Sequence, residues 1–512
     1  MDRSTRIHSL FDAALARAPQ QVFLHEPGRD WRFADLAPLV QAAADELRGD
    51  GVTAGDRVLI VAENCPAHVA LILACSRVGA WSCGVNARMA PGEIAAIAAK
   101  ADARLAYYTA GVSDAAAAHA ARSAGGPARP SVLPGLLRSA PRREALAESG
   151  PLRDAVGAVI FTSGTTGTPK GVLMTHDGVT HFARVSAASR ALGPGDRAYA
   201  CLPMTHIFGL ATVLLASMQA GASLVMRPRF DAAEALQALA QDGVSQFQGP
   251  PTLFARLLAE MDQQGLAQPP APALRYLYTG AGPLDVALKQ RVEAAFGQPL
   301  HHGYGLSEYA GSIHLTRRGE WRHDTSAGYL VDGAELQVVD ASSGQPLPAG
   351  QRGEICMRGR GLMPGYFRDA EATAAVMRPG GWYASGDLGE LHEDGALFVV
   401  GRLKEMIIRS GFNVYPAEVE AALNQFAAVQ RSAVVGKPTR DAQGDLNEDV
   451  LAFIELRAGA VWDEATRAAL DAHLREQLAP YKRPASVTVL ESLPMTTSGK
   501  LMKRRLLEPG AA

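Results

Sequence analysis

Residues 155–174 read AVGAVIFTSGTTGTPKGVLM, and this stretch decides the fold class of the chain. The apolar run from Ala155 to Thr162 predicts a buried strand, which leads into a loop of glycines and hydroxyl residues with one lysine, Lys170. Glycines let a backbone approach a polyphosphate, and successive N–H groups form a concave anion-binding surface. Residues 172–174 predict a second strand, and the Walker A pattern is absent. The stretch therefore predicts a phosphate-binding loop between two strands, not a P-loop NTPase.

Short apolar runs alternate with longer helical patterns on both sides of this loop. Buried strands are predicted at residues 57–62, 80–85, 198–202, 222–226 and 274–278. An apolar helix is predicted between the first two of them, at residues 67–79. This alternation is typical of a mostly parallel sheet that is covered by helices on both faces.

The pattern of predicted secondary structure changes twice in the second half of the sequence. From Gly333 it consists of short alternating strands separated by Gly and Pro, and residues 413–500 have the content of a small α+β domain. The predicted domains are an N-terminal domain at 1–401, a hinge at 402–405 and a C-terminal domain at 406–512. The predicted fold class is α/β, with layered αβαβα sheets and a β-rich subdomain in the large N-terminal domain.

Composition excludes several functional classes. Hydrophobic residues make up 47% of the 512 residues, and 50 Lys and Arg nearly balance 52 Asp and Glu. This balance gives no basic surface for nucleic acid, and we expect neither a membrane-spanning helix nor a signal peptide. The 5 cysteines are scattered without a Cys-x-x-Cys pair, which suits a reducing compartment. We therefore expect a cytoplasmic protein without a zinc site.

The loop resembles the phosphate loop of the acyl-adenylate-forming (AMP-binding) superfamily, in its acyl-CoA synthetase and aryl-CoA ligase branch. Further motifs follow in the family's order along nearly the whole chain. The resemblance implies ATP, Mg²⁺ and coenzyme A as cofactors, and it implies a small C-terminal domain that moves as a lid. It also implies that the following loop residues bind the phosphates: Thr162, Ser163, Gly164, Thr165, Thr166, Gly167 and Lys170.

A second motif is the run from Gly303 through Gly305 to Glu308. A Tyr between two glycines can present its ring to a nucleobase, and a Glu supplies the hard oxygen that Mg²⁺ prefers. The resemblance implies that Tyr304 stacks on adenine, Ser307 contacts the α-phosphate and Glu308 positions the magnesium. The family usually has Thr where this chain has Ser307, so the hydroxyl is retained.

Four later motifs complete the resemblance. Asp387 and Arg402 resemble the ribose contacts of the family, and Lys404 matches its hinge position. Gly411 resembles the residue that lines the passage for the pantetheine arm in a second pose of the lid. Lys500 resembles the catalytic lysine, and an ammonium group there would offset the repulsion between a carboxylate and the α-phosphate.

The segment 202–210 matches the wall of the family's acyl site. Amino-acid-activating members carry an Asp here, whereas this chain has Phe208 and Gly209, so we do not expect an amino-acid substrate. His206 matches a gate beside the reacting carboxylate, and a histidine held by a backbone partner is an equal alternative. The other wall segments, 248–252, 278–282 and 309–314, are small or apolar, and no Arg or Lys is evident for a second carboxylate.

We therefore expect an acid–thiol ligase that adenylates an apolar monocarboxylic acid, fatty or aryl/cyclic, and transfers it to coenzyme A. Chain length, and the choice between aliphatic and aromatic acids, stay open. One alternative is an enzyme that loads the phosphopantetheine of a carrier protein, and a remote one is a non-catalytic nucleotide-binding homologue. A homodimer is an expectation from the family alone.

Overall fold

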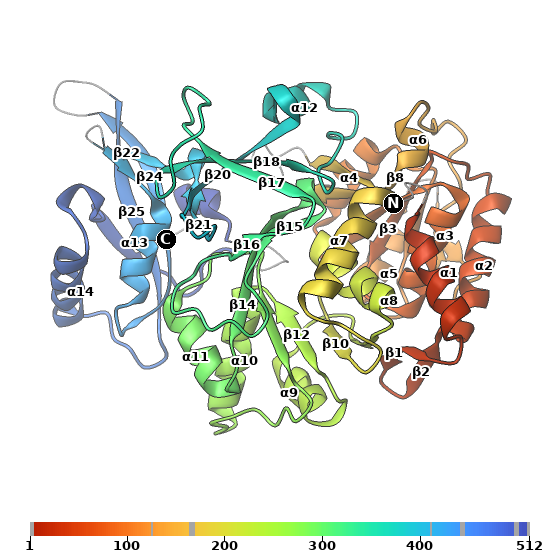
Figure 1. Cartoon of the computed structure of the whole chain (residues 1–512), viewed down its shortest axis with the longest axis horizontal. Coiled ribbons are helices and arrows are strands. Elements are labelled where there is room, and N and C mark those ends of the chain that lie inside the picture. Colours follow the sequence, from red (N-terminus) through yellow and green to blue (C-terminus); the bar gives the residue numbers. More distant parts are fainter. Residues whose placement is uncertain are drawn as a thin grey trace.

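Two mixed sheets, each with parallel central strands and antiparallel outer strands, lie in the N-terminal part of the chain, with helices around and between them (Figure 1). The computed structural model describes residues 5–123, 126–162, 169–409, 412–440, 446–495 and 501–508. The first sheet has the order β6-β7-β5-β3-β4-β8-β9, and its strands are β3 (Arg57–Ala62), β4 (Trp81–Asn86), β5 (Leu105–Tyr108), β6 (Arg129–Pro130), β7 (Leu137–Arg138), β8 (Val156–Thr162) and β9 (Lys170–Thr175). The second has the order β16-β15-β14-β13-β12-β10-β11-β1-β2, and its strands are β1 (Val22–Glu26), β2 (Arg29–Arg32), β10 (Arg197–Ala200), β11 (Ser223–Met226), β12 (Gln246–Gly249), β13 (Tyr276–Thr279), β14 (Leu300–Leu306), β15 (Gly311–Leu315) and β16 (Tyr329–Leu330).

The helices form layers inside and outside these sheets. Helix α7 contacts strands of both sheets, α4 and α5 contact the first sheet, and α10 and α11 contact the second. Their bounds are α1 (Ile7–Arg17), α2 (Phe33–Gly49), α3 (Pro66–Val78), α4 (Pro91–Ala101), α5 (Asp114–Ala121), α6 (Leu152–Ala155), α7 (His176–Ser189), the π-helix η1 (Phe208–Leu215), α8 (Ala216–Ala220), α9 (Ala232–Gln241), α10 (Pro251–Gln263), α11 (Val286–Phe296), the 3₁₀ turn η2 (Ser307–Tyr309) and α12 (Ala370–Val376). The predicted α/β class is confirmed.

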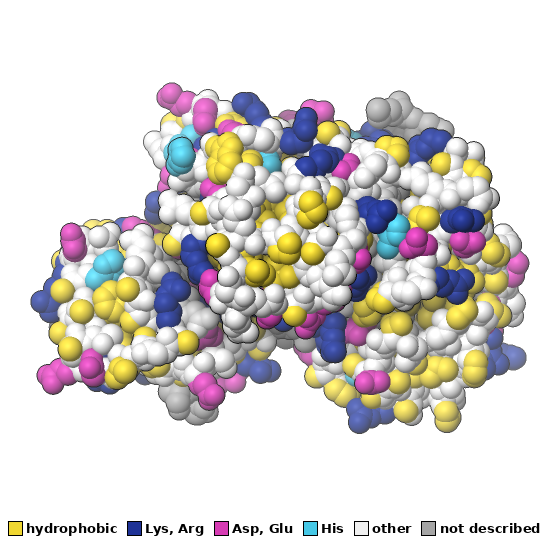
Figure 2. Space-filling model, turned by 90° about the horizontal axis from the view of Figure 1, so that it is seen from below, with side chains coloured by type: hydrophobic (Ala, Val, Ile, Leu, Met, Phe, Trp, Pro, Cys, Tyr) yellow, Lys and Arg dark blue, Asp and Glu magenta, His cyan; other side chains and the backbone are white. Residues whose placement is uncertain are grey.

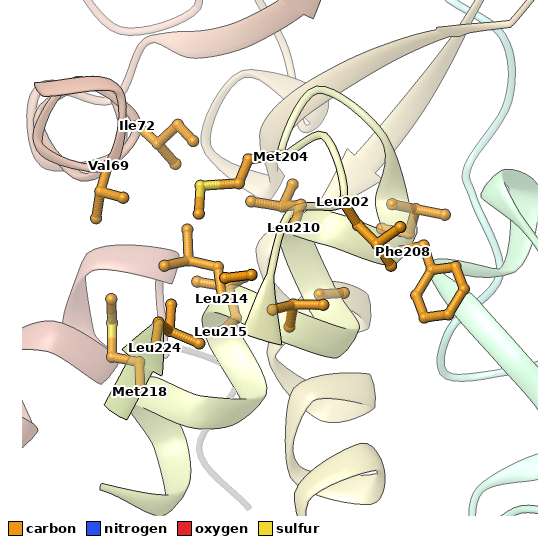
Figure 3. Packing of buried hydrophobic residues seen from close by; sticks show 14 of the residues in the cluster. Val69, Ile72, Leu202, Met204, Phe208, Leu210, Leu214, Leu215, Met218 and Leu224 are labelled. Atoms are coloured by element: carbon orange, nitrogen blue, oxygen red, sulfur yellow. The ribbon is translucent and has the colours of Figure 1, made fainter. Parts of the chain in front are cut away.

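Helix α3 shows how the sequence sets these elements. Pro66 occupies the first turn, where a missing N–H costs nothing, and Gly79 ends the helix in the left-handed region at φ 79°. The helix is apolar around most of its circumference, as expected for a helix that lies between layers. Figure 3 shows Val69 and Ile72 of α3 in one apolar cluster with side chains of η1, α8 and β11. Phe208, Leu202 and Leu210 belong to the same cluster, so the predicted acyl wall is continuous with the core.

His68 of α3 is buried in this core, and both ring nitrogens lack a hydrogen-bond partner among the described residues. Burial lowers the pKa of His68 to about 4, whereas an unfolded histidine titrates near 6.5. Between those values the unfolded state binds more protons, so the free energy of unfolding falls as the pH falls. We expect His68→Leu to reduce the loss of stability between pH 8 and pH 5 by about 2 kcal/mol. Urea unfolding at both pH values measures this difference, and equal losses in both proteins would contradict the assignment.

The second half of the chain forms smaller sheets. A β-rich sheet has the order β17-β18-β20-β19, with β21 paired to β20. Its strands are β17 (Ala334–Val339), β18 (Arg352–Gly359), β19 (Met377–Arg378), β20 (Trp382–Leu391) and β21 (Leu397–Arg402), and the 3₁₀ turn η3 (Pro379–Gly381) precedes β20. The C-terminal elements are η4 (Leu403–Glu405), β22 (Ile407–Arg409), β23 (Phe412–Val414), α13 (Pro416–Asn424), β24 (Val429–Arg440), β25 (Leu446–Leu456), α14 (Glu464–Gln477), η5 (Pro480–Lys482), β26 (Ser486–Val489) and η6 (Lys503–Leu507).

The C-terminal elements from β22 onward form a lobe at one end of the molecule (Figure 1). Figure 2 shows this lobe set off from the larger body by an indentation of the surface. It has an apolar cluster of its own, which includes Ile407, Val434 and Leu470. The residues predicted as a hinge comprise the end of β21 and the turn η4, which directly precede the lobe. Motion about this turn stays a prediction.

All 5 cysteines are buried free thiols: Cys65, Cys75, Cys83, Cys201 and Cys356. Burial raises the pKa of each of them, to about 12 for Cys201 and to about 11 for Cys356. Within the described ranges, no helix has the length and apolar character needed to cross a bilayer.

Candidate active site

Three of the predicted nucleotide contacts meet at one edge of the β-rich sheet. Tyr304, near the end of β14, donates a hydrogen bond from its hydroxyl to Asp387 Oδ2 at 2.7 Å. Asp387 lies on β20 opposite Arg402 on β21, and Arg402 Nε is 3.3 Å from Asp387 Oδ1. Burial, together with the charge of Asp387, raises the pKa of Tyr304 well above its ordinary value, so the phenol stays protonated as the donor. An aromatic ring, a carboxylate and a guanidinium are thus held side by side.

The turn that carries Asp387 is fixed by its own hydrogen bonds. The Asp387 N–H donates to Ser385 Oγ at 3.0 Å, and the Ser385 hydroxyl donates to the carbonyl of Ile355 at 2.7 Å. The Gly386 N–H donates to Glu354 Oε1 at 3.0 Å, and Gly386 has a φ of 71° that favours glycine. Glu354 is a buried carboxylate that the sequence analysis missed, because nothing on β18 distinguishes it from a surface residue of an alternating strand.

Glu308 and Lys170 both contact Tyr366, a second tyrosine that the sequence analysis missed. The Tyr366 hydroxyl donates to Glu308 Oε1 at 3.0 Å, and Lys170 Nζ lies 4.9 Å from the centre of the Tyr366 ring. Burial and the charge of Glu308 raise the pKa of Tyr366. Ser307, which precedes Glu308 in η2, is buried. A single carboxylate such as Glu308 fits Mg²⁺, which is held mostly by substrate phosphates and water and needs few protein ligands.

Several predicted phosphate and lid residues lie outside the described ranges: Ser163, Gly164, Thr165, Thr166, Gly167, Gly411 and Lys500. Their neighbours are placed. Thr162 and Lys170 are register partners at the ends of β8 and β9, so these two residues border the phosphate loop on adjacent antiparallel strands. Met495 and Leu501 form an antiparallel bridge on either side of the segment with Lys500. Lys404 is exposed in η4.

Two glycines of the second motif are required by close packing. A Cβ atom on Gly303 would lie 2.4 Å from the Tyr278 hydroxyl oxygen, and one on Gly305 would lie 2.2 Å from the carbonyl oxygen of Gly311. Both distances are shorter than any real contact of a Cβ atom, so a side chain at either position would displace the strand. The Tyr278 hydroxyl therefore packs against the backbone of Gly303, the residue that precedes Tyr304.

The predicted acyl-wall segments come together around Tyr278. The rings of Phe208 and Tyr278 pack edge to face, with centroids 5.7 Å apart, and the Tyr278 hydroxyl is 3.0 Å from Ser312 Oγ. His206 Nδ1 accepts the backbone N–H of Phe208 at 3.2 Å, so the backbone-held alternative has a partner in the structure. The gate role of His206 stays a prediction.

A buried cation that the sequence analysis did not foresee contacts one of these predicted wall segments. Arg190 follows α7, and its guanidinium donates to Gln248 Oε1 at 2.5 Å and to the carbonyl of Thr212 at 2.6 Å. In the sequence this residue stands at a polar helix end before Gly193 and Pro194, which is typical of exposed positions. Only the tertiary structure shows that it is buried.

Comparison with known proteins agrees with these features. Residues 11–367 match the family described as AMP-binding enzyme, and residues 418–500 match the AMP-binding enzyme C-terminal domain. The chain is 33% identical over 496 residues to 4-coumarate–CoA ligase 5 of Oryza sativa subsp. japonica, covering 94% of this chain and 89% of that protein. It is 32% identical over 493 residues to a feruloyl-CoA synthase of an Amycolatopsis species, covering 95% of both.

Solved structures show the same likeness over nearly the whole chain. ATP-bound MatB from Rhodopseudomonas palustris superposes with a TM-score of 0.84 at 27% identity and covers 98% of each chain. The anthranilate CoA ligase AuaEII in complex with anthranoyl-AMP gives a TM-score of 0.84 at 25% identity, covering 99% of this chain and 97% of that one. The expected resemblance is confirmed: the chain belongs to the AMP-binding enzyme family.

Proposed function

We propose that this protein is an AMP-forming carboxylic acid–CoA ligase. A carboxylate oxygen attacks the α-phosphorus of ATP, and the P–O bond to the leaving pyrophosphate breaks with its electron pair on pyrophosphate. The sulfur of coenzyme A then attacks the acyl carbon and gives up its proton, a C–S bond forms, and the C–O bond to AMP breaks with its electron pair on the AMP phosphate. The observation that carries the proposal is the pair of clusters around Asp387 and Glu308, each of which joins residues far apart in the sequence.

The described residues have these proposed roles in the first step. Tyr304 stacks on adenine while its hydroxyl holds Asp387, and Asp387 with Arg402 binds the ribose hydroxyls. Lys170 and the loop after Thr162 hold the phosphates. Glu308 positions Mg²⁺, which neutralises charge on the phosphates, and Ser307 contacts the α-phosphate.

The second step is assigned to the C-terminal lobe. We propose that it turns about Lys404, so that Lys500 leaves the site and the loop with Gly411 enters it to line the thiol passage. Among the relatives, a long-chain-fatty-acid–CoA ligase of Bacillus subtilis and the two aryl ligases above are all named as CoA-dependent. These names favour coenzyme A over a carrier protein as the acceptor.

The acid is proposed to be an apolar monocarboxylic acid, fatty or aryl/cyclic. Phe208 and Tyr278 give its binding wall an aromatic, buried surface. The relatives include ligases named for fatty acids and for aryl acids, so both classes stay candidates. The buried free thiols suit a reducing cytoplasm, and the homodimer stays an expectation from the family.

Pyrophosphate release with MgATP tests this function. The panel contains fatty, aromatic, cyclic and dicarboxylic acids, each with and without coenzyme A. We expect release that depends on one class of acid and that accelerates with coenzyme A. Acid-dependent release that ignores coenzyme A would move the assignment to carrier-protein loading, and no release with any acid would contradict the enzyme assignment.

A further inference from the structure

The buried carboxylate of Glu354 lies beside the turn that carries Asp387. Glu354 on β18 is 7% exposed, and no Lys or Arg among the described residues forms an ion pair with it. Its Oε1 accepts the N–H of Gly386 at 3.0 Å. Burying a carboxylate is costly unless hydrogen bonds or a cation compensate for the lost water. The contact with Gly386 provides such a bond, and it holds the residue that directly precedes Asp387.

Residues 385–387 form a bulge in the pairing of β18 with β20. Glu354 is opposite Leu388 and Cys356 is opposite Ala384, so one residue of β18 faces three residues of β20. A bulge bends its strand, changes the direction of a side chain and leaves backbone groups without partners in the ladder. The φ of 71° at Gly386 belongs to this bulge. The direction of Asp387, its last residue, therefore depends on how the bulge is held.

Glu354 supplies the acceptor that the ladder lacks at the bulge. A hydrogen bond from an N–H group to a carboxylate is stronger than one to a neutral oxygen, so it fixes the Gly386 peptide firmly. Without an acceptor this buried donor is unpaired, which is unfavourable, and a shift of the bulge along β20 relieves it. A shift by one residue turns each side chain to the opposite face of a sheet. Asp387 would then lose Tyr304 and Arg402.

We propose that Glu354 is a positioning residue for nucleotide recognition, which holds the bulge and thereby directs the Asp387 carboxylate to the ribose hydroxyls. This inference rests on the proposed function, in which Asp387 and Arg402 bind the ribose. Asp387 is itself only 7% exposed, so its backbone determines where its carboxylate lies. The effect of Glu354 is thus confined to the ribose and does not extend to the phosphates or the acid.

The test compares ATP with 2′-deoxy-ATP and 3′-deoxy-ATP, each of which lacks one ribose hydroxyl. Isothermal titration calorimetry of the full-length protein with Mg²⁺ and without an acid gives the Kd of each nucleotide, so the identity of the acid does not enter. We expect the wild-type protein to bind ATP about tenfold to a hundredfold more tightly than at least one deoxynucleotide, the range for one hydrogen bond to a charged group.

Glu354→Met is the informative variant, because it keeps an unbranched side chain of similar length but has no oxygen acceptor. We expect its preference for ATP to fall to near unity, with the Kd of the deoxynucleotides unchanged. Glu354→Gln retains an oxygen that can accept the Gly386 N–H, and it is expected to keep the preference.

Ile355→Ala is the matched control on the same strand. The Ile355 side chain is fully buried and packs against Gly389, so its loss lowers the thermal midpoint but leaves the acceptor of Gly386 in place. We expect this variant to keep the preference for ATP. If Glu354→Met does not fold, Glu354→Asp takes its place, because the shorter side chain withdraws the carboxylate from Gly386 and is expected to weaken the preference.

Four outcomes would overturn the inference: no preference in the wild-type protein, a full preference in the Glu354→Met or Glu354→Asp protein, an equal loss in Glu354→Gln, or an equal loss in Ile355→Ala. None of them involves pyrophosphate release, so the proposed function is tested separately by the panel of acids. Absence of ATP binding by the wild-type protein would overturn both.

Discussion

Replacing Lys500 with alanine is expected to lower the rate of acyl-adenylate formation by about 10²–10³-fold, as for other losses of a group that stabilises transition-state charge. Two anions, the carboxylate and the α-phosphate, must meet in this step, and an ammonium group between them offsets their repulsion. The residues that flank the segment are anchored, because Met495 is bridged to Leu501 and Lys503 Nζ lies 2.7 Å from Glu420 Oε1. Pyrophosphate release in single-turnover experiments measures this effect.

The same variant should still convert a preformed acyl-adenylate to its thioester, because in the proposed mechanism the lobe has turned before this step and Lys500 has left the site. Lys503→Ala is the matched control: it removes a lysine that is engaged by Glu420 and Glu405, and it should reduce the stability of the lobe rather than the rate of adenylation. A Lys500→Ala protein that adenylates at the full rate and fails only in thioester formation would refute the role assigned here.

Glu308→Gln is expected to lower adenylation by about 10²-fold and to raise the Mg²⁺ concentration needed for half-maximal rate. The amide retains an oxygen that can accept from Tyr366, so we expect η2 to keep its fold, but the negative charge that is proposed to bind the metal is lost. Loss of metal charge stabilisation costs several kcal/mol in such reactions. Magnesium titrations of pyrophosphate release measure both quantities.

Tyr366→Phe separates positioning from metal binding. It removes only the hydroxyl that donates to Glu308 and keeps the carboxylate charge, so the adenylation rate is expected to fall by about tenfold to a hundredfold, the range for one hydrogen bond to a charged group, without a change in the magnesium dependence. If Glu308→Gln left the magnesium dependence unchanged, the metal would have to be held by another carboxylate.

The periodicity of apolar residues sufficed to predict much of the fold. The helix expected at 67–79 is observed as α3 at Pro66–Val78, and the strand expected at 222–226 is β11 at Ser223–Met226. These elements consist mostly of apolar residues, which the folded structure buries, so the local sequence pattern is sufficient to predict them. The π-helix η1 was not predicted, because eight consecutive buried residues carry no periodicity that distinguishes helix types.

The candidate site was predictable only where a residue lies in a recognisable motif. Tyr304, Asp387 and Arg402 were identified in this way, and the structure brings them together. Tyr366 and Arg190 were missed, because each acquires its place through contacts with residues more than 50 positions away, Glu308 and Gln248. No local pattern records such contacts, and a charged residue at a helix end is normally exposed.

The buried thiols give the protein a practical property. A thiolate is the reactive form of cysteine, and burial both raises the pKa of these thiols and shields them from reagents. Colorimetric thiol reagents added to the native protein should therefore report the consumption of coenzyme A with little background. A single cysteine introduced on the exposed face of α14 could likewise carry a fluorescent label, and the rotation of the lobe could be followed during turnover without first removing the native cysteines.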